Sequence, residues 1–174
     1  MSLNSFFYPK SVAIVGASRK PGKVGYTLVK KLELFNKVFY VNVEGYEING
    51  KKCYKSLREI KENIDLVIIA IRADFVKNIL EDCSHKKINS CIIISAGFGD
   101  TGNNKLEREI LGIAKKSKIR ILGPNNFGVV NADNSFDCTF SKSRPVKGNI
   151  AFASQSGALW SYICEYSKEN NIGF

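Results

Sequence analysis

The chain has 174 residues, 44% of them hydrophobic, and a formal net charge of +10, which predicts one globular domain with part of a second, and anionic partners. Its longest apolar runs, 66–71 and 91–94, are too short to cross a bilayer, and its N-terminus lacks the pattern of a secretory signal. The lysines and arginines are spread along the chain without interleaved aromatic residues, so we expect a cytoplasmic protein with neither a nucleic acid nor a membrane as partner.

The first predicted elements are a strand, a tight turn and a helix. The β-branched run Val12–Val15 ends at Gly16, and an apolar-periodic stretch predicts a helix over 25–34. A helix start offers unpaired N–H groups and a partial positive charge, which attract anions. The turn adds three cationic side chains, Arg19, Lys20 and Lys23. This pattern predicts a seat for a phosphorylated nucleotide cofactor, the alternative being a purely structural glycine turn.

Four more apolar runs predict parallel strands. They span 37–42, 65–70, 90–95 and 118–122, and each is continuously hydrophobic, as a strand covered on both faces requires. Helical patterns over 73–83 and 103–117 alternate with them, and a short helix is expected over 56–60. The alternation predicts an α/β domain of Rossmann-like type, with a doubly wound parallel sheet, over residues 1–130.

The rest of the chain is expected to begin a second domain. Residues 131–148 are polar, which is typical of a linker or an edge segment. The pattern then restarts, with a predicted strand over 149–153, a turn over 154–157 and a helix over 158–168. Because one βα unit cannot bury both of its faces, it either extends the first sheet or belongs to a second domain, and we interpret 149–174 as the first βα unit of a truncated flavodoxin-like α/β domain.

The glycine spacing of the first turn departs from the dinucleotide fingerprint G-x-G-x-x-G. Gly16 is followed by Ala17-Ser18 and a longer basic insert, and the second strand ends at Asn42 rather than at an acid. Glu44 follows closely and is able to reach a ribose hydroxyl. Spacing alone therefore leaves NAD(H) open as the ligand.

The chain carries few residues suited to catalysis. His85 is the only histidine, and its context, EDCSHKK, places it at the exposed end of a helix. No partner ligands stand at zinc spacing, and there is no Ser/His/Asp arrangement. The five cysteines form no C-x-x-C pair, which favours free thiols in a reducing cytoplasm. We expect neither a catalytic residue nor a metal site in this chain.

Five stretches, in order along nearly the whole chain, carry a family resemblance. They read FFYPKSVAIVGAS, NIDLVIIAIRADFVKNIL, CIIISAGFGDTG, IRILGPNNFGVVN and KGNIAFASQSGAL. Together they resemble the CoA-binding α portion of the NDP-forming acyl-CoA synthetases, such as the ADP-forming acetyl-CoA synthetases, which are relatives of succinyl-CoA synthetase.

The resemblance implies that coenzyme A lies across the carboxyl ends of the strands. The first loop would hold its phosphates, the end of the second strand its adenosine, and the ends of the third and fourth strands its pantetheine. The implied CoA contacts are Gly16, Ala17, Ser18, Arg19, Lys23, Gly25, Asn42, Ile71, Arg72, Ala73, Ser95, Ala96, Gly97 and, near the thiol, Asn125. A phosphate site is implied at the second turn, at Ser154, Ser156 and Gly157, where a serine before a helix also fits simple capping.

Four positions depart from the family pattern. Arg72 stands where the family often has proline, and Glu44 stands near a basic position. Asn126 replaces a frequent cysteine, and Asp100 replaces a common glutamate. These departures concern the implied contacts with the adenine side of CoA more than those of the phosphate loop.

The implied activity is acyl-CoA + phosphate + NDP = carboxylate + CoA + NTP, through a phosphohistidine. In the family that histidine lies in the second domain, so this chain is predicted to bind CoA and to be inactive alone. The implied partners are ATP or ADP, phosphate, a small carboxylate and an ATP-grasp (β) subunit or domain, in an oligomeric full enzyme. Two alternatives stay open: a stand-alone regulatory CoA-binding module and an NAD(H)-binding redox protein.

Overall fold

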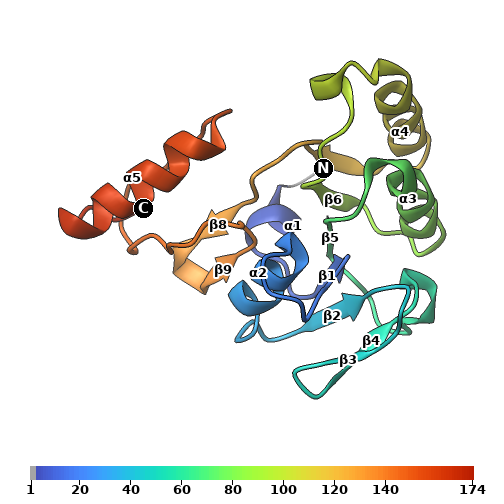
Figure 1. The fold of residues 1–174 in the computed structure, drawn as a ribbon, viewed down its shortest axis with the longest axis horizontal. Helices are drawn as coiled ribbons and strands as arrows, with labels where there is room; N and C mark the ends of the chain where they lie inside the picture. Colours follow the sequence, from blue (N-terminus) through green and yellow to red (C-terminus); the bar gives the residue numbers. More distant parts are fainter. Residues whose placement is uncertain (1–2) are drawn as a thin grey trace.

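The five apolar runs that end at residue 122 form adjacent strands of one sheet. The computed structural model describes residues 3–174 and places these strands at β1 (Val12–Val15), β2 (Val38–Val41), β5 (Leu66–Ile69), β6 (Ser90–Ile93) and β7 (Arg120–Leu122). All of their pairings with one another are parallel (Figure 1). The predicted strands and the parallel α/β fold are confirmed.

The order of the strands creates a switch point beside β1. The seven-stranded sheet has the order β3-β4-β2-β1-β5-β6-β7, with Val12 opposite both Val38 and Leu66. The strands that follow β1 in the chain, β2 to β4, lie on one side of it, and β5 to β7 lie on its other side. In open sheets of this kind, ligands bind outside the carboxyl ends of the strands at this point.

Two strands at the edge of the sheet were not predicted. β3 (Glu47–Ile48) and β4 (Lys51–Tyr54) form an antiparallel hairpin, and β4 pairs with β2 in parallel. The turn between them is Asn49-Gly50, with both φ angles positive, at 51° and 71°. This dipeptide is the strongest short-range hairpin signal, so the sequence contained the information.

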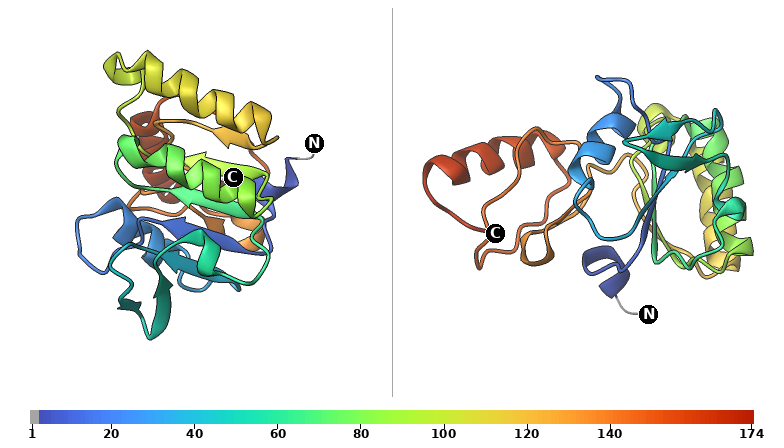
Figure 2. Two further views of the ribbon diagram at one scale, coloured as in Figure 1. Left: turned by 90° about the vertical axis from the view of Figure 1, so that its right-hand side faces the viewer. Right: turned by 90° about the horizontal axis from the view of Figure 1, so that it is seen from below.

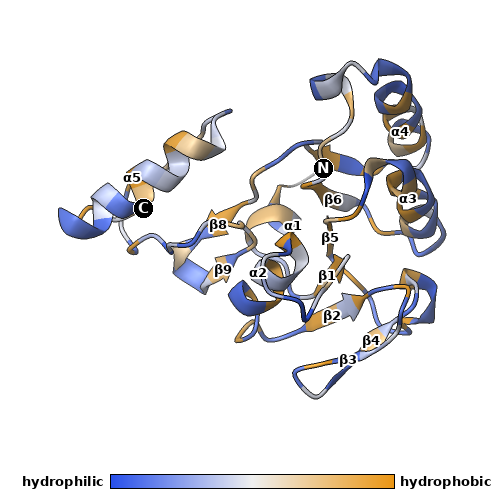
Figure 3. Ribbon diagram, viewed as in Figure 1, coloured by the Kyte–Doolittle hydropathy of each residue, from blue (hydrophilic) through white to orange (hydrophobic). Residues whose placement is uncertain are grey.

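Helices cover both faces of the sheet, because alternate residues of each strand point to opposite sides (Figure 2). Ala13 and Val15 face one cluster, and Val12 and Ile14 face the other. The first face carries η1 (Leu57–Glu59), η2 (Ala73–Phe75), α3 (Val76–His85) and α4 (Asn104–Lys116), and the second carries α1 (Asn4–Phe7) and α2 (Val24–Lys31). Figure 3 shows the hydrophobic residues on the central strands and mixed polar and apolar surfaces on α3 and α4.

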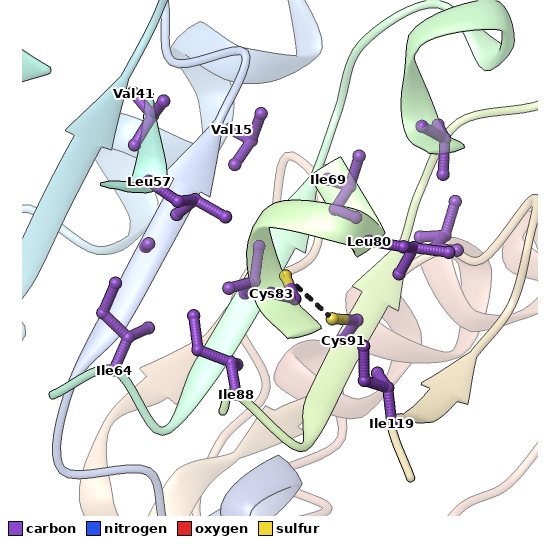
Figure 4. Close-up of a cluster of buried hydrophobic side chains, with 14 of the residues drawn as sticks. Val15, Val41, Leu57, Ile64, Ile69, Leu80, Cys83, Ile88, Cys91 and Ile119 are labelled. Carbon is purple, nitrogen blue, oxygen red and sulfur yellow. Dashed lines mark hydrogen bonds between the residues drawn. The ribbon is translucent and has the colours of Figure 1, made fainter. Parts of the chain in front are cut away.

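Two buried thiols meet in the first cluster. The Sγ atoms of Cys83 on α3 and Cys91 on β6 are 3.6 Å apart (Figure 4). The hydrogen bond with Cys91, and then burial, hold the pKa of the Cys83 thiol well above its ordinary value. Burial also raises the pKa of Cys53 to about 11 and that of Cys138 to about 12. The thiols of Cys53, Cys83 and Cys138 are therefore protonated near neutral pH and serve as packing groups.

The segment after β7 packs on the second face. β8 (Val130–Asn131), η4 (Ala132–Asn134) and β9 (Phe136–Asp137) form a small antiparallel unit, and Phe136 and Cys138 belong to the core cluster of α2. The Lys31 ammonium of α2 lies 2.6 Å from an Asp137 carboxylate oxygen, and both side chains are buried. The domain boundaries expected at 130 and 148 stay a prediction.

The strand expected over 149–153 does not form. These residues belong to no strand, and the bridge nearest to them pairs Val146 with Gly173. A strand needs the hydrogen bonds of a neighbouring strand, and the sheet ends elsewhere, at β7. The predicted helix is present as α5 (Gly157–Glu169), which lies apart from the sheet in Figures 1 and 2.

The remaining predicted helices are present, with small shifts. The pattern over 73–83 gives η2 followed by α3, and the short helix expected over 56–60 is the 3₁₀ turn η1. A further 3₁₀ turn, η3 (Gly99–Thr101), precedes α4. Within the described part of the chain, no helix is both long and apolar enough to span a membrane.

Replacing Gly112 with alanine is expected to raise the free energy of unfolding by about 0.5–1 kcal/mol. Gly112 is exposed in α4, and an added Cβ would meet no atom within 4 Å. Urea denaturation followed by circular dichroism measures the change. Gly102→Ala is the control, because that residue also has open space but a φ of +83°, so its substitution should destabilise the chain. A loss of stability in the Gly112 variant would contradict the prediction.

Candidate functional site

The predicted CoA contacts gather at one edge of the sheet. Parallel strands end on the same side, and the loops after β1, β2, β5 and β6 start there. Gly16–Ser18 follow β1, Asn42 follows β2, Ile71–Ala73 follow β5, and Ser95–Gly97 follow β6. The topology therefore brings together residues that are up to about 80 positions apart in the sequence.

Glycine permits the close approach of the first loop to its neighbours. Gly16 has a φ of +91°, and a Cβ there would overlap the carbonyl oxygen of Ala70 at the end of β5. A Cβ on Gly25, in the first turn of α2, would overlap the carbonyl oxygen of Gly16. The two glycines thus let the β1 loop, the β5 loop and the start of α2 meet at the switch point.

The start of α2 has the features of an anion seat. No side chain caps it, whereas Asn103 caps α4 and Ser156 caps α5 through their side chains. Its first turn contains no acidic residue. The N–H groups of Gly16 and Ala17 are already used, because both donate to the carbonyl of Val41, at 2.9 and 3.2 Å. The anion-binding capacity therefore lies at the helix start rather than at those two amides.

Three cations surround this helix start. Arg19, Lys20 and Lys23 are exposed, and none forms an ion pair with a carboxylate of residues 3–174. Ser18 is buried, and its hydroxyl accepts a hydrogen bond from the N–H of Lys20 at 3.1 Å. The uncompensated charge favours a phosphorylated ligand.

The loops after β5 and β6 contact each other directly. The hydroxyl of Ser95 accepts a hydrogen bond from the N–H of Ile71 at 3.2 Å. A Cβ on Gly97 would lie 3.2 Å from the Cβ of Ala73, so the two loops pack closely there. Arg72 of the β5 loop is exposed and pairs with Asp74 at 2.8 Å. Ala96 of the β6 loop is also exposed.

A cavity of about 1070 Å³ lies beyond these loops. The N–H of Asn125 donates to the carbonyl of Ser95 at 2.9 Å, and Asn125 also lines the cavity. The three predicted phosphate residues, Ser154, Ser156 and Gly157, line it as well. Asn125 is therefore the predicted CoA contact that shares this cavity with the three predicted phosphate residues, and the other predicted CoA contacts lie outside its lining.

The serines of the second turn already have local partners. The Ser156 hydroxyl accepts from the N–H of Leu159 at 3.2 Å and caps α5, and the Ser154 hydroxyl accepts from the N–H of Ser156 at 2.9 Å. A Cβ on Gly157 would lie 2.6 Å from the ring of Phe127. These contacts define the shape of the turn, and a phosphate role for it stays a prediction.

Two residues that shape these loops were not predicted. The Tyr46 hydroxyl donates to the carbonyl of Ala17 at 3.2 Å, and Asp100 accepts from the N–H groups of Gly97 and Phe98. An aromatic residue beside Gly45 and an acid seven residues after the end of β6 are weak local signals. Their importance follows from contacts between loops. His85 lies exposed at the end of α3, as predicted from its context.

Comparison with known proteins gives consistent results along the chain. Residues 10–132 match the family model described as a CoA binding domain. An acetate–CoA ligase [ADP-forming] of Methanocaldococcus jannaschii is 45% identical over 168 residues, covering 96% of this chain. The α subunit of acetate–CoA ligase [ADP-forming] I of Pyrococcus furiosus is 44% identical over 182 residues, covering 99% of this chain.

A solved structure has the same architecture. The acetyl-coenzyme A synthetase 1 of Ca. Korarchaeum cryptofilum, in complex with phosphate and ADP, superposes with a TM-score of 0.93 at 34% identity, covering 99% of this chain and 38% of that one. The chain spans 24% of the M. jannaschii relative and 39% of the P. furiosus relative. The similarity therefore concerns one part of much longer proteins.

Proposed function

The chain belongs to the CoA-binding domain family, and we propose that it provides the CoA seat of an ADP-forming acyl-CoA synthetase. The observation that supports this most directly is the series of loop contacts at the carboxyl edge of the sheet. Gly16 packs against the β5 loop, Ile71 donates to Ser95, and Asn125 donates to Ser95 and lines the cavity. CoA is a long molecule with phosphates at one end and a thiol at the other, which suits a row of adjoining loops.

The phosphates of CoA bind at the start of α2 in this proposal. Lys23 supplies charge at the helix start, Ser18 and N–H groups at the beginning of α2 supply hydrogen bonds, and Gly25 allows the close approach, while Arg19 supplies charge on the side of the β2 loop. Asn42 borders the adenosine. Arg72 stands where it can add a further phosphate or ribose contact.

The pantetheine chain follows the loops after β5 and β6. Ile71 and Ala73 on one side, and Ser95–Gly97 on the other, form the small-residue walls of this stretch. The thiol then reaches Asn125 at the mouth of the cavity, opposite the turn at Ser154–Gly157, where phosphate binds.

The chain acts as a binding part and contributes no catalytic residue of its own in this proposal. The reaction of the full enzyme converts acyl-CoA, phosphate and NDP into carboxylate, CoA and NTP through a phosphohistidine outside this chain. An ATP-grasp subunit or domain, ATP or ADP, and a small carboxylate are the partners of the oligomeric full enzyme. A cytoplasmic setting suits the five free, buried cysteines.

Calorimetric titration of the chain with CoA and, separately, with NADH tests the proposal. We expect CoA to bind with a dissociation constant in the micromolar range, about 8 kcal/mol of binding free energy, and to bind more weakly as salt increases. We expect no signal with NADH and no acyl-CoA synthesis by the chain alone. NADH binding without CoA binding would contradict the CoA seat, and turnover by the isolated chain would contradict its role as a binding part.

Lys23→Gln is expected to weaken CoA binding about tenfold, since it removes one charge-assisted contact. Lys118→Gln is the matched control, because Lys118 precedes β7 at the opposite edge of the sheet and its loss should leave the affinity unchanged. Equal effects of the two substitutions would show that the affinity for CoA depends only on the net charge of the chain, and would contradict the assigned role of Lys23.

A further inference from the structure

A polar clamp joins the loops after β1 and β2. The carbonyl oxygen of Ala17 accepts two hydrogen bonds, one from the Asn42 amide at 2.9 Å and one from the Tyr46 hydroxyl at 3.2 Å. The Asn42 amide also donates to the Tyr46 hydroxyl at 3.2 Å. Asn42 in turn accepts from the N–H of Glu44 at 3.0 Å, so the whole β2 loop is tied to the phosphate loop.

Tyr46 is held at its backbone as well as at its hydroxyl. Its carbonyl accepts from the N–H of Cys53 on β4 at 3.1 Å, which ties the residue to the edge hairpin. The Tyr46 ring is therefore a fixed platform, and the guanidinium carbon of Arg19 lies 4.7 Å from its centroid. A cation over a tyrosine ring at this distance is attracted by the π face, so the arginine is oriented before any ligand arrives.

The position of Arg19 differs from that of Lys23. Lys23 stands at the start of α2, where in the proposed function the backbone amides and the helix dipole bind the pyrophosphate. Arg19 lies over a residue of the β2 loop, the side of an open α/β sheet where the ribose of a nucleotide lies. An arginine at this side accommodates a phosphate attached to the ribose, whereas an acid such as Glu44 favours a free ribose hydroxyl.

We propose that Arg19, oriented by Tyr46, recognises the phosphate on the ribose of CoA and makes the site select CoA over dephospho-CoA. The inference rests on the proposed function, since it names one subsite of that ligand. Arg19 is the specificity-determining residue, because its fork of donors matches a phosphate, and Tyr46 is a positioning residue that acts through Arg19 and the Ala17 carbonyl.

Calorimetric titration with CoA and with dephospho-CoA tests the inference. The two ligands differ only in the ribose phosphate. We expect the chain to bind CoA at least about tenfold more tightly, the effect of one charge-assisted hydrogen bond. Arg19→Gln should weaken CoA binding and leave dephospho-CoA binding nearly unchanged, so that the ratio of the two affinities approaches one.

Two substitutions separate the ring of Tyr46 from its hydroxyl. Tyr46→Phe keeps the platform for Arg19, so it should lower both affinities by the same factor and preserve their ratio. Tyr46→Leu removes the platform and should reduce the ratio as well. A merely structural role of Tyr46 would lower both affinities equally in both variants, and that result would overturn its assignment as a positioning residue.

Lys37→Gln is the matched control, because Lys37 also lies over an aromatic ring, 5.7 Å from the centroid of Phe39, but precedes β2 at the opposite edge. It should leave both affinities and their ratio unchanged. If the unmodified chain binds CoA and dephospho-CoA equally, or prefers dephospho-CoA, the inference is wrong and the CoA seat stands. If it binds neither ligand, the proposed function itself is wrong. Thermal melts of every variant identify any that fails to fold.

Discussion

Replacing Asp137 with alanine is expected to lower the free energy of unfolding by about 3–5 kcal/mol. Its carboxylate lies 2.6 Å from the Lys31 ammonium, and the two side chains are only 3% and 8% exposed. It also accepts two hydrogen bonds from Thr139, from the N–H at 3.0 Å and from the hydroxyl at 2.6 Å. The substitution leaves the buried Lys31 ammonium hydrogen-bonded to the carbonyl of Ser143, 2.9 Å away, but without that carboxylate.

The expected effect is large because the pair joins α2 to β9. The Arg144 guanidinium lies 3.9 Å from the same carboxylate and donates to the carbonyl of Lys31, so one carboxylate organises both sides of the contact. A buried charge without its partner costs far more than the intact pair contributes. Urea denaturation at neutral pH, followed by circular dichroism, measures the loss.

Asp133→Ala is the matched control for this measurement. Asp133 also pairs with a lysine, Lys147, at 2.9 Å, but their side chains are 58% and 68% exposed. Water screens this pair, so its loss should change the free energy of unfolding by about 0–1 kcal/mol. Similar losses in the two variants would show that burial of the Asp137 pair has no energetic consequence. The double variant Lys31→Met with Asp137→Leu should recover much of the stability, because no lone charge is left buried.

Replacing Gly16 with alanine is expected to cost about 2–5 kcal/mol of stability, from a disfavoured backbone conformation together with overpacking. Gly16 has a φ of +91°, and the new Cβ would overlap the backbone carbonyl of Ala70, which has no freedom to rotate away. The β1 and β5 loops must then separate at the switch point. Since the CoA phosphates are proposed to bind there, the affinity for CoA should fall by about tenfold or more.

Gly22→Ala separates the backbone effect from the overlap. Gly22 has a similar φ of +82° in the same loop, but a Cβ there would meet no atom within 4 Å. It should therefore cost only the conformational share, about 1–2 kcal/mol. The difference between the two variants, measured by urea denaturation, reports the overlap with Ala70. If both variants lose the same stability and CoA affinity, the close approach of the two loops is not what requires glycine at residue 16.

The sequence predicted the centre of the sheet well, for a physical reason. A run such as Leu66–Ile69 is apolar at every position, and only a strand buried on both faces requires that pattern. The hairpin at Asn49-Gly50 was missed although its turn signal was present, because its strands are short and partly polar. The strand expected over 149–153 was wrong, because an apolar run alone does not supply a neighbouring strand.

The candidate site divides in the same way. The glycine turn, the helix start and the cations around Gly16 were readable from the order of residues, since they depend on a single strand–turn–helix unit. The link from Ser95 to Asn125, the shared cavity, and the placement of Arg19 over Tyr46 depend on loops that different strands deliver. Contacts between side chains that are close in space but distant in the sequence produce no periodic pattern in the sequence.

By itself the sequence determined the fold class and the five mutually parallel strands, and it predicted an anion seat after the first of them, because those properties arise from short-range patterns of hydrophobicity and turn chemistry. The tertiary structure decided the rest. The strand order placed the switch point beside β1, the buried pair of Lys31 and Asp137 joined β9 to α2, and the contacts of Tyr46 placed its ring under Arg19. These features depend on which elements meet in space. Contacts between elements that are distant in the sequence form only when the whole chain is folded, so no local pattern specifies them.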